Sequence, residues 1–167
     1  MAIDYRAKTK EFEGFVPTVY LDSVGKRTVG YGFNIDDPII KKMIPIEVRR
    51  GKRQMTRSEA DSIFNTLYAN AGNDAKKFVG DKVFNSMPKN AQASLIDMSY
   101  NLGYNKLTGF QDFRAAVINK DYKTAAAELK DSKWFNQVGR RSRYHYDVFK
   151  NTNPYTWNDL TKSIQGE

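Results

Sequence analysis

The residues best suited to chemistry lie near the start of the chain, in EGFVPTVYLDSVGKRTVGYG, residues 13–32. This stretch holds two carboxylates, Glu13 and Asp22, and a hydroxyl, Thr28. Hydrolysis of a glycosidic bond needs a proton donor on one side of the bond and a second carboxylate on the other. If the stretch forms a hairpin, Asp22 and Thr28 face each other across its mouth and can hold a water opposite Glu13. The same residues also fit a helix-end acid and a turn-capping aspartate without catalysis.

Other chemistries find little support. The chain has no cysteine, which excludes disulfides and thiolate metal sites, and its single histidine argues against a histidine-based zinc site. We therefore expect neither a metal nor a cofactor. That histidine, His145, lies in RRSRYHYDVF, and we interpret it as a surface or packing residue rather than a catalytic one. GYGFN is not a dinucleotide fingerprint, because its glycines open no helix, and no Walker-type phosphate loop is present. Carboxylate chemistry remains.

The elements that position the two acids can be read from the surrounding pattern. Residues 2–12 predict a short helix that ends at Gly14. The β-branched and aromatic runs 18–22 and 28–35, joined by SVGKR, predict a β-hairpin. The basic stretch 38–54, with two prolines, is predicted to be the least regular region.

Beyond this region the pattern is helical. Thr56 and Glu59 form a capping box that starts a long helix toward Gly80. The run NAQASLIDMSYNLG is apolar nearly all round, which places its helix in the middle of a core, with Gly103 as its end. We also expect Thr108 and Asp121 to cap later helices.

These elements predict an α+β fold in a single domain of two lobes. A small β lobe spans about 14–56, a connecting helix 57–80, and a helical lobe 81–167 together with helix 2–12. The net charge of +8 favours a polyanionic partner. No apolar run suits a signal peptide or a membrane span, so we expect synthesis in the cytoplasm and no membrane insertion.

The order of the motifs resembles the catalytic segment of phage lysozymes of the T-even type. The matching residues are Glu13-Gly14, Tyr20-Leu21-Asp22 and the G-x-x-T-x-G-x-G run from Gly25 to Gly32. The resemblance continues in order along nearly the whole chain, in MTRSEADSIFN (55–65), SLIDMSYNLGYNKLTGF (94–110), AAAELKDSKWFNQVGRRSR (125–143) and TWNDL (156–160).

This resemblance implies a lysozyme-like fold and a muramidase, which cleaves the β-1,4 bond between N-acetylmuramic acid and N-acetylglucosamine in peptidoglycan. By position, Glu13 is the general acid, Asp22 is the second carboxylate and Thr28 helps to hold the attacking water. Family members of this type invert at the anomeric carbon, and inversion needs carboxyl groups about 6.5–9.5 Å apart.

The resemblance also implies substrate contacts from Asn34 and Tyr100, and further ones from Asn101, Phe113, Glu128 and Gln137. Phe113 and Glu128 depart from the residue types expected there. Plain core packing is an equal alternative for Tyr100 and Phe113.

Three further residues are expected to support the site: Gly30, Tyr31 and Arg141. Arg141 shares an inward helix face with Tyr144 and Val148, so it is the candidate ion-pair partner of Glu13, and the pair would tether the first helix to the last. Where relatives pair a histidine with an acid, this chain has Phe33 and Leu67, which predicts an apolar contact.

Two other functions are open. A lytic transglycosylase needs the acid but no held water, and the presence of both Asp22 and Thr28 argues against it. A basic nucleic-acid-binding module would need a reading helix or an exposed aromatic sheet, and neither is recognisable. For the lysozyme we expect a monomer that acts on the cell wall after a separate holin-type protein permeabilises the membrane.

Overall fold

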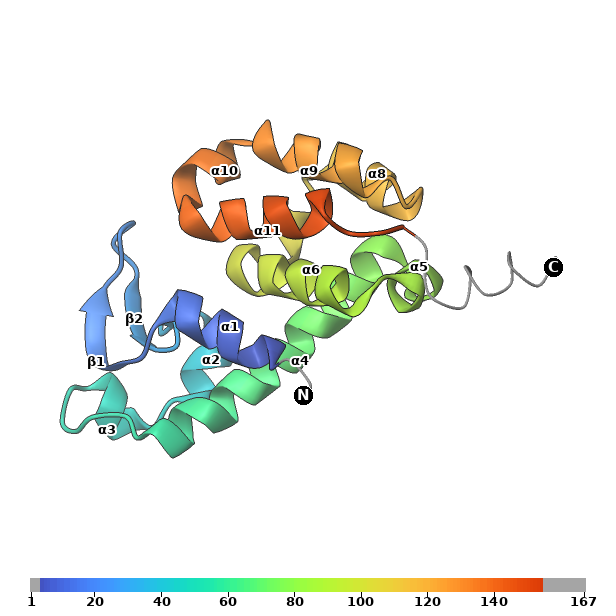
Figure 1. Ribbon diagram of the computed structural model, residues 1–167. Helices are drawn as coiled ribbons and strands as arrows, with labels where there is room; N and C mark the ends of the chain where they lie inside the picture. Colours follow the sequence, from blue (N-terminus) through green and yellow to red (C-terminus); the bar gives the residue numbers. More distant parts are fainter. Residues whose placement is uncertain (1–3, 155–167) are drawn as a thin grey trace, which may run out of the picture. The chain divides into compact units, whose positions relative to one another are not determined.

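The computed structural model describes residues 4–154 (Figure 1). By its internal contacts the chain divides after Ala69 into two compact units. The predicted TWNDL motif lies outside the described residues. The division falls inside the long helix α4 (Arg57–Val79), so the lobe bounds given above stay a prediction. Among the residues described, no helix combines the length and the apolar character needed to cross a membrane.

The first unit combines a small sheet with helices. Its elements, besides the first half of α4, are α1 (Tyr5–Glu13), β1 (Val16–Leu21), β2 (Arg27–Gly30), β3 (Phe33–Asn34), α2 (Pro38–Met43) and α3 (Ile46–Arg49). The three strands are antiparallel in the order β1-β2-β3. The predicted hairpin is therefore extended by a third strand.

The predicted strand 28–35 is broken, which is a correction. The chain reverses at Tyr31 and Gly32, where Gly30 and Gly32 take φ values of +69° and +74°. A side chain at position 30 would also fail sterically, because its Cβ would lie 2.6 Å from the Phe33 ring. Glycine at both positions permits the tight turn from β2 to β3.

The expectation of an irregular 38–54 is also wrong, because α2 and α3 form there. Asp37 caps α2 by accepting hydrogen bonds from the N–H groups of Ile39 and Ile40, and Pro38 occupies the first turn. Proline suits that place, since the first turn needs no backbone N–H and favours its fixed φ.

The start of α4 confirms the predicted capping box. The Thr56 N–H donates to Glu59 Oε1 at 3.0 Å, and the Glu59 N–H donates to Thr56 Oγ1 at 3.1 Å. The helix runs through Gly72 without a break to Val79.

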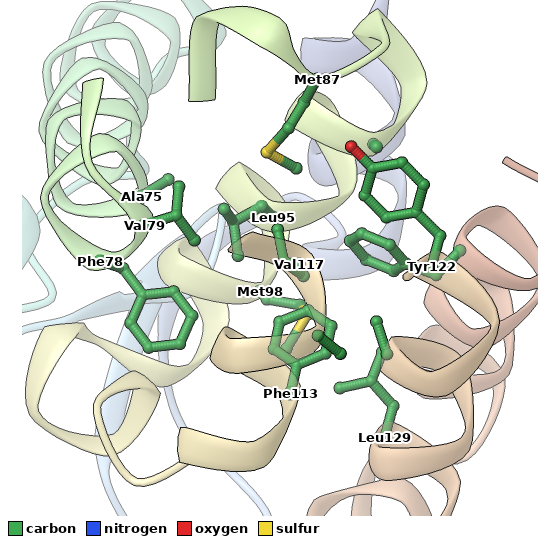
Figure 2. Packing of buried hydrophobic residues seen from close by; sticks show 14 of the residues in the cluster. Ala75, Phe78, Val79, Met87, Leu95, Met98, Phe113, Val117, Tyr122 and Leu129 are labelled. Atoms are coloured by element: carbon green, nitrogen blue, oxygen red, sulfur yellow. The ribbon is translucent and has the colours of Figure 1, made fainter. Parts of the chain in front are cut away.

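The second unit is helical, as predicted. Its remaining helices are α5 (Asp81–Ser86), α6 (Lys89–Leu102), α7 (Tyr104–Leu107), α8 (Gln111–Ile118), α9 (Tyr122–Lys130), α10 (Lys133–Val138) and α11 (Arg140–Lys150). Figure 2 shows Leu95 and Met98 of α6 among the side chains of the core cluster, close to Phe113 and Val117 of α8. Helix α6 thus packs in the core of this unit, as predicted.

Two of the three predicted end signals in this unit are confirmed. Gly103 ends α6, and Asp121 caps α9 by accepting from the Thr124 N–H. Thr108 is not the cap of α8: its hydroxyl donates to the Asn105 carbonyl at 2.7 Å, and α8 begins after Phe110 without a side-chain cap. The hydroxyl bonds the nearer carbonyl of the preceding turn.

Candidate active site

Glu13 is the last residue of α1, and both ends of that helix are fixed. Asp4 caps the start through the N–H groups of Arg6 and Ala7. At the other end, the Gly14 N–H donates to the Lys10 carbonyl at 2.8 Å, and the Lys10 ammonium lies 3.0 Å from Asp61 Oδ1 on α4.

Tyr31 strengthens this anchor. Its hydroxyl donates to the same Asp61 oxygen at 3.2 Å, and the Lys10 ammonium lies 5.3 Å from the centre of its ring. Hydrogen bonds from Lys10 and from Tyr31 keep the pKa of Asp61 below its ordinary value. The predicted supporting residue Tyr31 therefore ties the turn after β2 to α1 and α4, next to Glu13.

The Glu13 carboxyl group packs against the backbone of Gly32. A Cβ at position 32 would lie 2.9 Å from Glu13 Cδ and closer still to Oε2. The Glu13 carboxyl group thus occupies the space that a side chain at position 32 would need.

Asp22 and Thr28 are linked through the backbone of one residue, Lys26. The Lys26 N–H donates to Asp22 Oδ1 at 2.8 Å. The Lys26 carbonyl accepts from Thr28 Oγ1 and from the Asp22 N–H, each at 2.9 Å. The hairpin turn therefore holds the aspartate and the threonine in a fixed relation.

Both side chains keep acceptor capacity after these bonds. The second carboxylate oxygen of Asp22, Oδ2, accepts no hydrogen bond from the part of the chain that the structure describes. The Thr28 hydroxyl donates its proton to Lys26, so its oxygen lone pairs remain to accept one. Asp22 does cap its turn, and that role occupies only Oδ1.

Thr28 lies in the middle of a polar row across the sheet. In the strand register it is opposite Tyr20 of β1 on one side and opposite Asn34 of β3 on the other. Directly opposite residues point to the same face of a sheet. The predicted contact residue Asn34 thus belongs to the same face as the predicted water-binding residue.

Tyr20 is a site residue that the sequence analysis quoted in a motif but gave no role. Burial raises the pKa of its phenol, and the charges of Glu13 and Asp22 raise it further. A tyrosine within electrostatic reach of both acids stays protonated and donates hydrogen bonds. Its position two residues before Asp22, on the same side of an extended strand, is the signal that points to it.

The predicted contact residues of the second unit lie in different settings. Asn101, in the last turn of α6, accepts a hydrogen bond from Trp134 Nε1 at 2.9 Å. Tyr100 beside it is half-buried, and Gln137 on α10 is exposed. Substrate contact by these residues stays a prediction.

Phe113 and Glu128 differ from one another in burial. Phe113 is 1% exposed, and its ring meets the Phe149 ring edge-on at 5.2 Å. Glu128 is half-buried, and it lines a pocket of about 230 Å³ together with Phe113 and Ser132. The structure thus brings Phe113 and Glu128 to one pocket, and substrate contact by both residues stays a prediction.

Arg141 has a partner that the sequence analysis missed. It is 7% exposed on α11, and its guanidinium binds Asp97 of α6 through Nε at 2.8 Å and Nη2 at 3.0 Å. His145, one turn further along, is fully buried, which corrects the surface alternative and agrees with packing. Asp97 is an acid within the otherwise apolar run NAQASLIDMSYNLG, and an acid in a helix that packs in a core is the signal that predicts a buried ion pair. The predicted pair of Arg141 with Glu13 stays a prediction.

Phe33 is fully buried and Leu67 is half-buried, and their direct contact also stays a prediction. Within residues 4–154 no cluster of three or more His, Asp or Glu side chains could hold a metal ion.

Comparison with known proteins agrees with this geometry. The phage lysozyme family model matches residues 10–144. A probable T4-type lysozyme 2 of Dictyostelium discoideum is 25% identical over 150 residues, which cover 83% of this chain and 88% of that protein. The pre-baseplate central spike protein Gp5 of Enterobacteria phage T4 is 26% identical over 144 residues, 78% of this chain but only 25% of that protein. The chain belongs to the phage lysozyme family and is a glycoside hydrolase.

Proposed function

We propose that this protein hydrolyses the β-1,4 bond between N-acetylmuramic acid and N-acetylglucosamine in bacterial peptidoglycan, with inversion at the anomeric carbon. The family implies peptidoglycan as the substrate. The observation that carries the mechanism is the link through Lys26, which leaves Asp22 Oδ2 and the Thr28 oxygen able to accept the protons of one water.

In this mechanism Glu13 donates its proton to the glycosidic oxygen as the bond to the anomeric carbon breaks. The water held by Asp22 and Thr28 attacks that carbon from the opposite face, and Asp22 takes the released proton. A single displacement of this kind inverts the configuration. The expected gap of about 6.5–9.5 Å between the two carboxyl groups leaves room for the water.

Other residues have supporting parts in the proposal. The residues that would contact the saccharide are Asn34, Tyr100, Asn101, Phe113, Glu128 and Gln137. Arg141 would supply positive charge for the Glu13 carboxylate that remains after proton transfer. The protein would act as a monomer on the cell wall, after synthesis in the host cytoplasm and release through a holin-type membrane lesion.

The first test compares the native chain with Glu13→Gln for clearing of a peptidoglycan suspension. We expect a loss of about 100-fold or more, because the amide cannot donate the proton that the leaving group needs. Glu11→Gln, on an exposed part of the same helix, is the matched control and should clear at the native rate. Equal clearing by native and Glu13→Gln proteins would contradict the assignment.

Product analysis separates the mechanisms. Hydrolysis leaves a free reducing end, whereas a lytic transglycosylase leaves a 1,6-anhydro sugar. NMR of the first product formed should show the α-anomer, since the bond cleaved is β. A β-anomer would indicate retention and a covalent route instead.

A further inference from the structure

A hydrogen-bonded cluster of four polar side chains, Ser94, Asp97, Arg141 and His145, lies in the interior of the second unit, between α6 and α11. Ser94 Oγ is in hydrogen-bond contact with His145 Nδ1, and His145 Nε2 lies 2.6 Å from Asp97 Oδ2. The bidentate pair of Asp97 with Arg141 completes the cluster. All four residues are at most 7% exposed. Their spacing, three apart on α6 and four apart on α11, puts each pair on one helix face.

The contacts determine where the protons are. Among the described residues of the second unit, the charged groups that act on the pKa of His145 are Asp97 and Arg141. Burial lowers the pKa of His145, and the Asp97 hydrogen bond offsets this only in part, so the ring is neutral at pH 7. Nε2 then donates to Asp97, and Nδ1 accepts from the Ser94 hydroxyl. One carboxylate and one guanidinium leave the cluster without net charge.

This connectivity is that of a Ser-His-Asp nucleophilic triad, yet it cannot act as one. Ser94 is 2% exposed and His145 is 0% exposed, so no substrate reaches the hydroxyl. The Trp134 ring stacks on the imidazole, with centres 5.9 Å apart and planes 16° apart. What the cluster can do is orient its fourth member.

Arg141 is the member whose orientation is determined. A guanidinium that binds both oxygens of a carboxylate is fixed in plane as well as in distance. The carboxylate is itself held, because Asp97 Oδ2 accepts from His145 as well as from Arg141 Nε. Burial would raise the pKa of Asp97, but the bonds from His145 and Arg141 outweigh it and keep that pKa below its ordinary value.

We propose that Ser94, His145 and Asp97 are positioning residues, which hold the Arg141 guanidinium in one orientation for the lysozyme reaction. The proposal rests on the proposed function, in which the charge of Arg141 supports Glu13. It adds three residues that contact no substrate and makes the neutral imidazole a condition for activity.

Acid should therefore disturb the cluster in a defined way. Protonation of Nδ1 removes the acceptor that the Ser94 hydroxyl uses, and it places a second cation against Asp97. The imidazolium and Arg141 then compete for one carboxylate. Activity should fall as His145 takes up its proton, at a pH below the ordinary histidine value of about 6.5.

The first experiment uses the fact that His145 is the chain's single histidine. Imidazole ¹⁵N NMR on the full-length protein therefore reports this ring alone. At pH 7 we expect the neutral tautomer with the proton on Nε2, and a titration midpoint below about 6.5. A proton on Nδ1, or an imidazolium at pH 7, would overturn the proposal.

The second experiment measures kcat and KM on soluble, uncross-linked peptidoglycan from pH 8 to about 4.5. His145→Gln keeps an N–H donor toward Asp97 and does not titrate. Asp97→Asn keeps the shape and removes the charge. We expect the kcat of the native protein to fall as the pH drops through the NMR midpoint, and His145→Gln to lack that step. Asp97→Asn should lose about 10- to 100-fold in kcat, with KM changed by no more than about twofold.

Val117→Ala is the control for stability, because Val117 is fully buried in the hydrophobic core of the same unit and is not one of the four polar residues. It should lower the melting temperature without moving the pH profile. The proposal would be overturned if His145→Gln kept the pH profile of the native protein. It would also be overturned if the acid step of the native protein lay more than one pH unit from the NMR midpoint. This second comparison needs no variant, so it decides the matter even where His145→Gln does not fold. Activity retained by Glu13→Gln would instead contradict the proposed function.

Discussion

Gly32 carries no side chain where the carboxyl group of Glu13 packs, and the two residues are in direct contact. Gly32→Ala should therefore push the Glu13 carboxyl group away from its position and also strain the backbone, since φ is +74° there. We expect a loss of about 100-fold in kcat, because small displacements of a catalytic group cost that much.

Gly51→Ala separates the two effects. Gly51 lies in the same unit with φ of +71°, but nothing lies within 4 Å of the Cβ that it would gain. It should show the backbone destabilisation of about 1 kcal/mol in urea unfolding, with native kcat. If both variants lost the same activity, the contact with Glu13 would not be the cause.

Thr28→Val should lower kcat by about 10- to 100-fold while KM changes little, because it removes the hydroxyl proposed to hold the water. The shape of the side chain is nearly kept, but the bond from Oγ1 to the Lys26 carbonyl is lost. Thr28→Ser retains the hydroxyl and should recover most of the activity. Steady-state kinetics on soluble peptidoglycan decide the matter, and an inactive Thr28→Ser variant would point to packing instead.

Glu59 should contribute stability that acid removes. The hydrogen bond from Arg53 is the main cause that lowers the pKa of Glu59 to about 2, and the Thr56 N–H adds to it. Because the folded pKa lies below the unfolded value, the contribution is present above about pH 4.5 and is lost as the pH falls toward 2.

Urea unfolding of native and Glu59→Gln proteins measures this. The variant should be less stable at pH 7 by about 1 kcal/mol or less, since the pair with Arg53 is partly exposed to solvent. The difference should shrink as the pH falls from 4.5. Glu47→Gln, an exposed acid of the same unit, serves as the control. A pH-independent difference would mean that the charge of Glu59 has no part in it.

Local signals predicted the parts of the fold that depend on neighbours in sequence. Thr56 and Glu59 are three residues apart and cap α4 as expected, and Gly14 and Gly103 end their helices. The break between β2 and β3 was missed because 28–35 looks like one continuous β-branched and aromatic run. Only the backbone angles of its glycines reveal the reversal.

The polar cluster was missed for a different reason. Asp97 and its partner His145 are 48 residues apart, so no local pattern links them. Each looks unremarkable in its own helix, one as an isolated acid among apolar residues and the other as part of a basic run. Their pairing depends on how α6 and α11 pack, which the order of residues alone does not state.

The link between Asp22 and Thr28 has a consequence for which residues position 26 can tolerate. The two bonds use the backbone N–H and the backbone carbonyl of Lys26, and its side chain takes part in neither. Selection at this position therefore acts on the main chain, and nineteen of the genetically encoded amino acids preserve the donor that Asp22 needs. Proline alone lacks an N–H. The residue at the centre of the water-holding turn is thus free to drift in sequence while its contribution to the site is conserved.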